Sequence, residues 1–478
     1  MLVLTVPVGV RAPGTGHRDG ILLAKISRST GLLTGVYSRR WNGLPIVSRP
    51  PRRRLRHTVF TTPMKITHIE TVRVGEKPDI IWVQVYTDTG LAGLGETWYA
   101  ARTVESAVHD HFAPLLVGKD PFAIERHWLN MFRLSDHAGY GGAEMRAISA
   151  LDMALWDIKG KAAGVPVYEL LGGKVRDRIR IYATGAPYIG AGTLAKELLE
   201  DGIIAMKMGP TIPIATPTEG QYLAPKELDR ALQPFRDVRD AVGGDMKIAN
   251  DGHGKWALPV AIQIAQAMEP LEIMWQEDLM PLLNPDSLLR LQESTSTPVC
   301  ISERLLGRWQ LRQYIENGSA RIVMPDLIWT GGISETYKIA VMASAHQVPV
   351  APHDATGPVN IFACAQICMS APNAMIMEHV RPYFLGWYGD FVDPNLPIEH
   401  GWLAAPQEPG IGTRLKPEVK ERQDATVRVT DESAAIPGMH DEGWVGRPDN
   451  FSPEMQAEME EIWRFRKMMA EAPEGLAE

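Results

Sequence analysis

Cysteine is scarce in this chain, which has only Cys300, Cys364 and Cys368 in 478 residues. So few cysteines exclude a disulfide framework and favour a reducing compartment, so we expect a cytoplasmic protein. Cys364 and Cys368 stand four residues apart, on one face of an expected helix. Two cysteines at that spacing are far more often small buried residues than half of a metal site, and we expect both to be buried.

Long apolar runs are also missing, and so is any excess of basic residues in the chain as a whole. The longest apolar run falls far short of the ~20 residues of a membrane span, which excludes a transmembrane helix. The net charge of −8 gives no reason to expect a nucleic-acid partner. With 45% hydrophobic residues, the chain is long enough for a barrel of roughly 250 residues and a smaller second domain.

Acidic residues are nearly absent from residues 1–63, which contain ten Arg, one Lys and a single acid, Asp19. Such a leader is compatible with a transit peptide or a nucleic-acid-binding arm. However, it has no sustained helical or strand period, whereas a clean strand follows directly after Met64. We therefore interpret 1–63 as a disordered extension, or as upstream sequence translated from a misplaced start.

The segment 64–178 has the pattern of an α+β unit. Two alternating segments, separated by Gly75 and Pro78, predict antiparallel strands, and apolar residues at helical spacing follow them. The expected elements are strands at 65–74 and about 80–87, and helices at about 102–116, 121–133 and 146–161.

From 179 to 400 short β-branched runs alternate with amphipathic helices, which is typical of repeated βα units and a parallel sheet. The runs are 179–183, 203–207, 246–251, 273–277, 298–303, 321–326, 348–353 and 374–378. An open doubly wound sheet would alternate in the same way, but eight runs at near-equal spacing favour a closed (β/α)8-type barrel. In 401–478 the alternation lapses, and we expect a short strand near 425–430 and a terminal helix at about 453–470.

Seven of the eight runs end in an ionisable residue. These residues are Lys207, Asp251, Glu277, Glu303, Asp326, His353 and Glu378. In a β/α barrel the carboxyl ends of the strands converge on one mouth, where the active site lies. The sequence therefore predicts an active site at that mouth.

Two patterns resemble those of a known family. The segment 150–173, ALDMALWDIKGKAAGVPVYELLGG, closely resembles the helix-and-turn signature of mandelate racemases and muconate lactonizing enzymes, a branch of the enolase superfamily. The order Asp251, Glu277, Glu303 on three successive strands resembles the magnesium ligands of that family. The resemblance spans about 64–435.

The resemblance implies an α+β capping domain, built from 64–178 and the tail 401–478, that closes over a catalytic barrel at 179–400. In this family loops of the capping domain complete the substrate pocket. The corresponding loops here are 97–100 and 136–142. They make Trp98, Tyr99 and Tyr140 candidate substrate-binding residues.

The carboxylates of Asp251, Glu277 and Glu303 would repel one another at one spot unless a cation neutralised them. Oxygen ligands favour Mg²⁺ over zinc, so we expect Mg²⁺ as the cofactor. The competing interpretation, salt bridges at helix starts, suits any one acid but not three at matched strand ends. Asp278, which directly follows Glu277, is expected to support the ligands rather than to bind the metal.

The chemistry that needs such a metal is removal of a proton next to a carboxylate, for which the enolase superfamily uses a Lys or His base. The resemblance assigns the base to His353, oriented by Asp326. Lys207 would be the cation that stabilises the ene-diolate. Glu378 would hydrogen-bond the substrate carboxylate, although an ordinary salt bridge remains an alternative.

Two departures from the family pattern refine the expected reaction. Racemases carry Lys-x-Lys on the second strand, but here the triplet is Lys207-Met208-Gly209, and glycine cannot carry protons. Asp251-Gly252-His253 resembles acid-sugar dehydratases, in which such a histidine protonates the departing hydroxyl. The sequence therefore predicts a homo-oligomeric dehydratase that turns a small-molecule sugar acid into a 2-keto-3-deoxy acid. An epimerase or cycloisomerase and, less well supported, a non-catalytic barrel are the alternatives.

Overall fold

The computed structural model describes residues 63–137, 139–185, 189–209 and 219–435, together with 461 and 464. In these ranges no helix is both long and apolar enough to cross a bilayer. The expected extension before Pro63, part of the Pro-rich stretch after Met208, and nearly all of the expected terminal helix lie outside the described residues.

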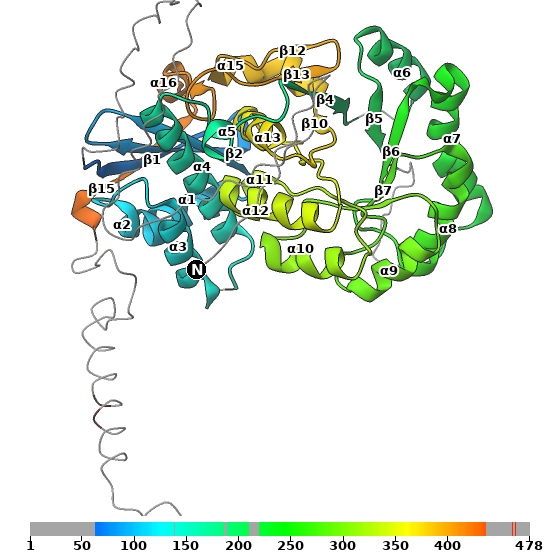
Figure 1. Ribbon diagram of the computed structural model, residues 1–478, viewed down its shortest axis with the longest axis horizontal. Coiled ribbons are helices and arrows are strands. Elements are labelled where there is room, and N and C mark those ends of the chain that lie inside the picture. The colour runs from blue at the N-terminus through cyan, green and yellow to red at the C-terminus, as the bar shows by residue number, and fades with distance from the viewer. Residues whose placement is uncertain are drawn as a thin grey trace, which may run out of the picture. The chain divides into compact units, whose positions relative to one another are not determined.

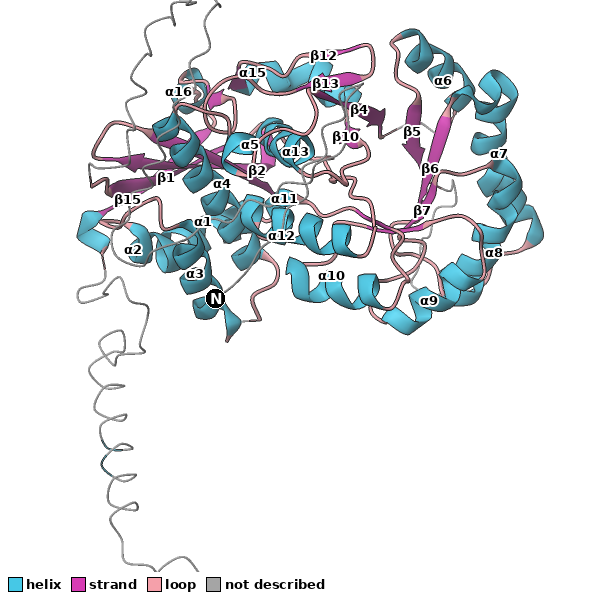
Figure 2. Cartoon of the chain, viewed as in Figure 1, coloured by secondary structure: helices cyan, strands magenta, loops and turns pink. Residues whose placement is uncertain are grey.

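An antiparallel sheet forms the first part of the fold, in the order β15-β1-β2-β3 (Figures 1 and 2). Its strands are β1 (Ile66–Val74), β2 (Lys77–Thr87), β3 (Ala92–Trp98) and β15 (Ala425–Asp431). The two strands expected at the start of the chain are confirmed. Because β15 pairs with β1 along its length, the tail after the barrel returns to this sheet, as the resemblance implied.

Strand β3 was not predicted, and its glycines explain why. Gly93 and Gly95 weaken a strand pattern, since glycine has no side chain to pack. A Cβ on either residue would lie within 2 Å of the carbonyl oxygen of Ala154 or Ala150. The two glycines therefore allow β3 to lie directly against the helix that carries these alanines.

Helices pack on one face of this sheet and bury its apolar side chains. They are α1 (Ala101–Ser106), a π-helical turn (Ala107–Phe112), α2 (Ala113–Leu116), α3 (Ile124–Asp136) and α4 (Ala143–Ala163). The expected helices are confirmed, although the first is interrupted by the π turn and α4 starts three residues early. Asp157 of α4 accepts hydrogen bonds from Leu94 of β3 and from Ile411 of the tail, so it joins the two segments of the capping domain.

A parallel ladder forms the second part. The strands are β4 (Arg178–Ala183), β5 (Ala205–Met208), β6 (Lys247–Asp251), β7 (Trp275–Glu277), β8 (Val299–Ile301), β9 (Ile322–Val323) and β10 (Met377–His379). Val350 bridges Val323 on one side and Ala374 on the other, and β10 pairs with β4. These pairings link all eight runs in one parallel ladder, and the predicted (β/α)8-type fold class is confirmed.

The barrel has an interior core and an outer one. The interior core takes a side chain from each of the eight runs, including Tyr182, Trp275 and Met324. The outer core lies between the strands and the surrounding helices (Figure 1). These helices are α6 (Ala191–Glu200), α7 (Pro225–Val242), α8 (Leu258–Met268), α9 (Pro285–Glu293), α10 (Gly307–Glu316), α12 (Gly332–Ala345) and α13 (Pro358–Ser370).

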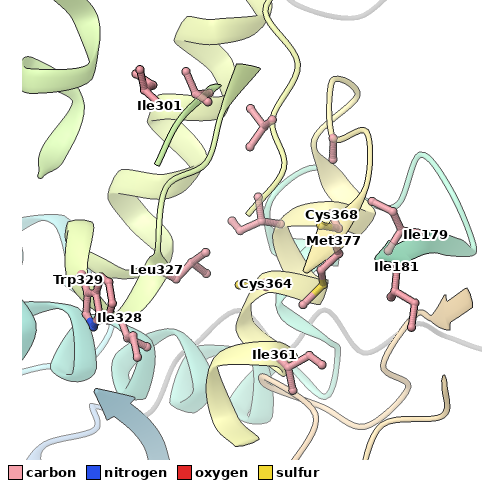
Figure 3. Close-up of a cluster of buried hydrophobic side chains, with 14 of the residues drawn as sticks. Ile179, Ile181, Ile301, Leu327, Ile328, Trp329, Ile361, Cys364, Cys368 and Met377 are labelled. Atoms are coloured by element: carbon pink, nitrogen blue, oxygen red, sulfur yellow. The ribbon is translucent and has the colours of Figure 1, made fainter. Parts of the chain in front are cut away.

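Helix α13 is buried along its whole length. Its Cys368 lies near Met377 of β10 (Figure 3), whereas the Cys364 Sγ is 3.7 Å from the carbonyl oxygen of His353. The interpretation of the two cysteines as buried residues is therefore confirmed. A hairpin that was not predicted, β12 (Ile398–Glu399) and β13 (Trp402–Ala404), pairs with the start of β4.

Glu96 of β3 joins the capping sheet to the barrel. Its carboxylate is fully buried, accepts a hydrogen bond from Trp82 at 2.8 Å, and accepts from the backbone N–H groups of Val359 and Asn360 in the first turn of α13. These N–H groups have no partner within their own helix, and a carboxylate is the acceptor that a helix N-terminus favours. Glu96 thus holds the helix that directly follows the strand run ending at His353.

We predict that Glu96→Ala lowers the free energy of unfolding by about 3 kcal/mol or more, because three buried donors lose their acceptor. Glu96→Gln, which keeps an acceptor oxygen of similar shape, should lose less. Urea unfolding of the two variants and the parent protein measures the difference. Equal stability of Glu96→Ala and the parent would contradict the role of this contact.

Candidate active site

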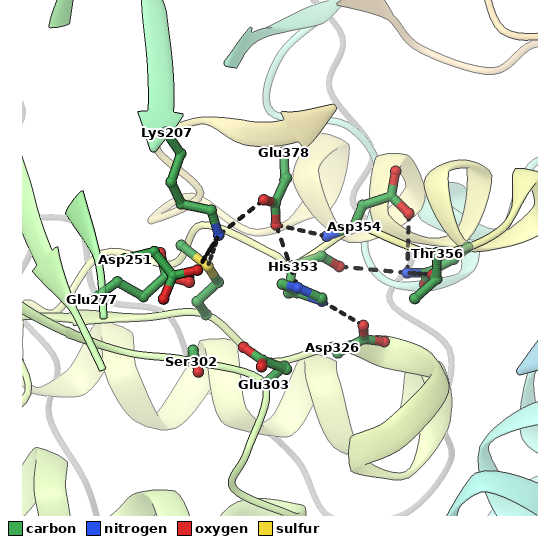
Figure 4. A network of polar contacts seen from close by, with 12 residues as sticks. Lys207, Asp251, Glu277, Ser302, Glu303, Asp326, His353, Asp354, Thr356 and Glu378 are labelled. Atoms are coloured by element: carbon green, nitrogen blue, oxygen red, sulfur yellow. Dashed lines mark hydrogen bonds and ion pairs between the residues drawn. The ribbon is translucent and has the colours of Figure 1, made fainter. Parts of the chain in front are cut away.

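The carboxyl ends of the barrel strands bring the predicted site residues together (Figure 4). Asp251 and Glu277 are direct partners in the β6–β7 ladder, and Asp326 and His353 are partners in a bridge between neighbouring runs. Adjacent partners in a parallel ladder project to the same side of the sheet. The convergence expected from the sequence therefore follows from the register of the strands.

Lys207 lies among the acids as a buried cation. Its Nζ is 2.8 Å from Glu277 Oε1, 2.9 Å from Glu378 Oε1 and 4.0 Å from Asp251 Oδ2. Burial by itself lowers the pKa of Lys207, but Glu277 and Glu378 outweigh burial and raise the pKa well above its usual value. Lys207 is therefore charged at any physiological pH.

His353 and Asp326 form a close pair. The His353 Nδ1 and Asp326 Oδ2 atoms are 2.6 Å apart, while the other carboxylate oxygen of Asp326 accepts from the Ile328 N–H at 2.9 Å. His353 Nε2 points toward Glu378 Oε2, 3.8 Å away (Figure 4). Asp326 thus fixes the ring and leaves Nε2 facing the mouth.

The same acids set the pKa of His353. Burial lowers it, but Glu378, Glu303 and Asp326 together outweigh burial and raise the pKa to about 10. Glu378 carries the opposite shift. Burial raises its pKa, but Lys207 and His353 outweigh burial and lower the pKa to about 2. Glu378 is therefore ionised between two cationic neighbours.

Asp251, Glu277 and Glu303 supply the oxygen donors that the sequence assigns to a metal ion. Burial raises the pKa of Glu277 well above its usual value, and the repulsion of Asp251, Glu378 and Glu303 adds to burial despite the contact with Lys207. As they stand, no three His, Cys, Asp or Glu side chains in the described ranges form a ligand set. The donor chemistry nevertheless fits a hard divalent cation, because an added positive charge would relieve the repulsion among these acids.

His253 lies at the edge of the site. Its backbone N–H donates to Asp251 Oδ1 at 2.8 Å, and its Nε2 is 3.1 Å from Asp251 Oδ2. Its side chain is 53% exposed, unlike that of His353. A cavity of about 240 Å³ at the mouth is lined by both Lys207 and His253, and also by Tyr383, which the sequence did not indicate.

Asp278 has the supporting position expected for it. It accepts hydrogen bonds from the backbone N–H and the hydroxyl of Ser302 and pairs with Arg304 at 3.2 Å. These contacts hold the chain on both sides of Glu303. Asp354, which no sequence pattern indicated, is also buried, and its N–H donates to Glu378 at 3.0 Å.

The three candidate substrate-binding residues lie in different places. The Tyr99 ring is 5.7 Å from that of Trp329, whose ring lies 5.3 Å from His353. The centroid of the Trp98 ring is 6.2 Å from that of the Trp387 ring. Tyr140 instead packs against Phe132 of α3, with the two rings tilted by 53°, and accepts a hydrogen bond from Gln310 of α10.

Such a site, with acids, a lysine and a His–Asp pair at the mouth of a capped β/α barrel, defines a class of enzymes that act next to a carboxylate. Two family models match the chain: the N-terminal domain of mandelate racemase/muconate lactonizing enzymes over 54–172, and the enolase C-terminal domain-like model over 191–419. The chain belongs to this family, and the resemblance noted in the sequence is confirmed.

Named relatives agree with this assignment. The chain is 37% identical to a D-galactonate dehydratase of Variovorax paradoxus, over 74% of this chain and 93% of the relative. It is 31% identical to a D-xylonate dehydratase of Haloferax volcanii, over 73% of this chain and 87% of the relative. It is also similar to the crystal structure of an enolase of the mandelate racemase subgroup from Agrobacterium tumefaciens. The identity is 42% and the TM-score 0.74, and the match covers 77% of this chain and 100% of that structure.

We predict that Asp326→Asn lowers the pKa of His353, because it removes one of the negative charges that raise it. The asparagine oxygen can still accept from Ile328, so the helix start is kept. NMR titration of the metal-free enzyme with ¹³Cε1-labelled histidine measures the pKa, and His353→Asn assigns the signal. An unchanged pKa would show that Asp326 does not act on the ring.

Proposed function

We propose that the chain is an acid-sugar dehydratase, a hydro-lyase that converts a sugar acid into a 2-keto-3-deoxy acid. The observation that carries this proposal is a pair of unlike histidines at the carboxyl ends of the barrel strands. His353 is buried and oriented by Asp326, whereas His253 is exposed and rests on Asp251. The named relatives, which dehydrate galactonate and xylonate, support the same reaction.

His353 Nε2 takes the proton from the carbon next to the substrate carboxylate. The electron pair left by that proton moves toward the carboxylate and forms an ene-diolate, whose negative charge Lys207 stabilises. Mg²⁺ bound by Asp251, Glu277 and Glu303 would supply Lewis-acid stabilisation of the same charge. His353 must be neutral to accept the proton, so neutralisation of the surrounding acids is a condition for its action.

His253 donates a proton to the hydroxyl on the neighbouring carbon, and that hydroxyl leaves as water. As the C3–O bond breaks, the electron pair of the ene-diolate forms the C2=C3 double bond of an enol. The enol then becomes the 2-keto acid by taking one proton from solvent at C3 and releasing the proton of its C2 hydroxyl to solvent. An exposed imidazole suits this role, because it exchanges protons with solvent after each turnover. Glu378, which Lys207 and the Asp354 N–H hold, would hydrogen-bond the substrate carboxylate only in its protonated form, because two ionised carboxylates repel each other.

An epimerase or cycloisomerase is the second candidate, with His253 as the other acid/base. Gly209 disfavours it, because the second strand has no second lysine to reprotonate the opposite face. The wider proposal is a cytoplasmic homo-oligomer that acts on a small-molecule sugar acid and binds neither nucleic acid nor membrane. In it, 64–178 and 401–478 form the cap, 179–400 form the barrel, and 1–63 contribute nothing to activity.

We predict that activity requires Mg²⁺ and that Glu277→Gln reduces kcat about 10²-fold or more, since stabilisation by a metal is worth several kcal/mol. Glu293→Gln, at an exposed position of α9, is the matched control and should keep full activity. Turnover is measured after chelation and after addition of Mg²⁺. Full turnover by the metal-stripped enzyme would show that the reaction does not need a metal ion.

We also predict that the two histidine variants fail at different steps. His353→Asn should abolish turnover and also exchange of the α-proton with deuterated solvent. His253→Asn should lower dehydration about 10²–10⁴-fold, the usual contribution of a general acid, while α-proton exchange continues. The exposed His346→Asn is the control. Undiminished dehydration by His253→Asn would exclude His253 as the acid.

A further inference from the structure

Two buried hydrogen-bond donors beside the active site have no acceptor among the described residues. They are Nη1 of Arg146, in the first turn of α4, and Nε1 of Trp329, on the short helix α11 (Leu327–Thr330). Figure 3 shows Trp329 beside Ile328 on that helix. Buried polar groups are nearly always paired, so two neighbouring orphans call for a ligand that supplies oxygen atoms.

The two side chains are neighbours and lie close to the base. The Arg146 Cζ is 4.4 Å from the centroid of the Trp329 ring and 5.9 Å from that of Tyr99. The Trp329 ring is in turn 5.3 Å from the His353 ring. Arg146 belongs to the capping domain and Trp329 to the barrel, so a ligand held by both would span the two domains next to His353.

The charge of Arg146 is not matched by a hydrogen-bonded acid. The acids that act on it at a distance include Asp326 and Glu303. Asp326 is already engaged with His353 and Ile328. Glu303 has the proposed role of metal ligand. A desolvated guanidinium prefers a carboxylate, which accepts two of its N–H groups at once, over a neutral hydroxyl.

We propose that Arg146 and Trp329 bind a second carboxylate, at the end of the substrate remote from the carboxylate near Lys207. The preferred substrate is then a sugar diacid, a hexarate, rather than a hexonate with a terminal hydroxyl. This inference rests on the proposed dehydration and specifies its substrate class. It also explains why a half-buried arginine of the cap lies over the tryptophan next to the catalytic histidine.

The test compares two substrates that differ only at the remote end, galactarate and galactonate. The parent enzyme should have the higher kcat/KM with the diacid. Arg146→Met should lower kcat/KM for the diacid about 10²-fold, mainly through KM, and for the monoacid only a few-fold, because a buried charge pair loses one partner. Arg146→Lys keeps the positive charge but loses the planar guanidinium, which can donate two hydrogen bonds to one carboxylate. Its kcat/KM for the diacid should therefore lie between those of the parent enzyme and Arg146→Met. Trp329→Phe, which keeps an aromatic ring but loses the N–H, should lower kcat/KM about tenfold for the diacid alone.

Lys159→Met is the matched control, because it removes another cation from α4 that lies over a tryptophan, Trp156. It should change neither substrate's kinetics. Equal losses on both substrates in Arg146→Met would overturn the inference and make Arg146 a residue that only shapes the site. A parent enzyme that prefers galactonate would overturn it too.

A binding measurement separates this inference from the proposed reaction. Calorimetric titration of the inactive His353→Asn enzyme with each acid, in the presence of Mg²⁺, should show tighter binding of galactarate. That preference should disappear when Arg146→Met is added. If neither acid yields a 2-keto acid but the binding preference holds, the reaction assignment fails and the carboxylate site stands. If binding is unaffected by Arg146→Met, the carboxylate site fails.

Discussion

Buried negative charge at the mouth of the barrel is the constraint on which the rest of the site depends. Asp251, Glu277, Glu303 and Glu378 come from separate strands and act on one another within a largely buried site. Lys207 contacts two of them directly, yet the pKa of Glu277 remains raised. One lysine therefore does not balance the cluster, which is the physical reason to expect a divalent cation there.

The electrostatic interactions among these buried groups also couple the metal ligands to the base. With a pKa of about 10, His353 is protonated at neutral pH and cannot take a proton. Two of the groups that raise this pKa are Glu378 and Glu303, one beside Lys207 and the other an expected metal ligand. A cation bound at Asp251, Glu277 and Glu303 would offset the charge of Glu303 and so lower the pKa of His353 toward the range in which it acts as a base. Metal binding and base activation are thus one electrostatic event in this account.

Much of this arrangement could be predicted from the sequence, because a short strand that ends in an ionisable residue can be recognised from neighbouring residues alone. The eight strand runs and the convergence of Lys207 and His353 on the barrel mouth depend only on the order and spacing of residues. Strand β3 could not be predicted, since Gly93 and Gly95 are dictated by contact with a helix some 60 residues further along. A local pattern carries no trace of such a contact.

The positions of side chains that reach the site from the capping domain could not be predicted from the sequence either. Arg146 lies at the start of a helix whose pattern indicates only packing, and Trp329 follows the strand run that ends at Asp326. Their meeting depends on how the cap lies on the barrel. Glu96 illustrates the same dependence, because a strand residue of the cap binds the N-terminus of α13 in the barrel.

The direct test of the central claim is a single product analysis. The enzyme is incubated with a hexarate and a hexonate in deuterated water with Mg²⁺, and the products are examined by NMR. The account predicts a 2-keto-3-deoxy acid with one deuterium at C3, placed stereospecifically if the enol is protonated in the site. An epimer or a lactone labelled at C2, with no 2-keto acid from any substrate accepted, would contradict it.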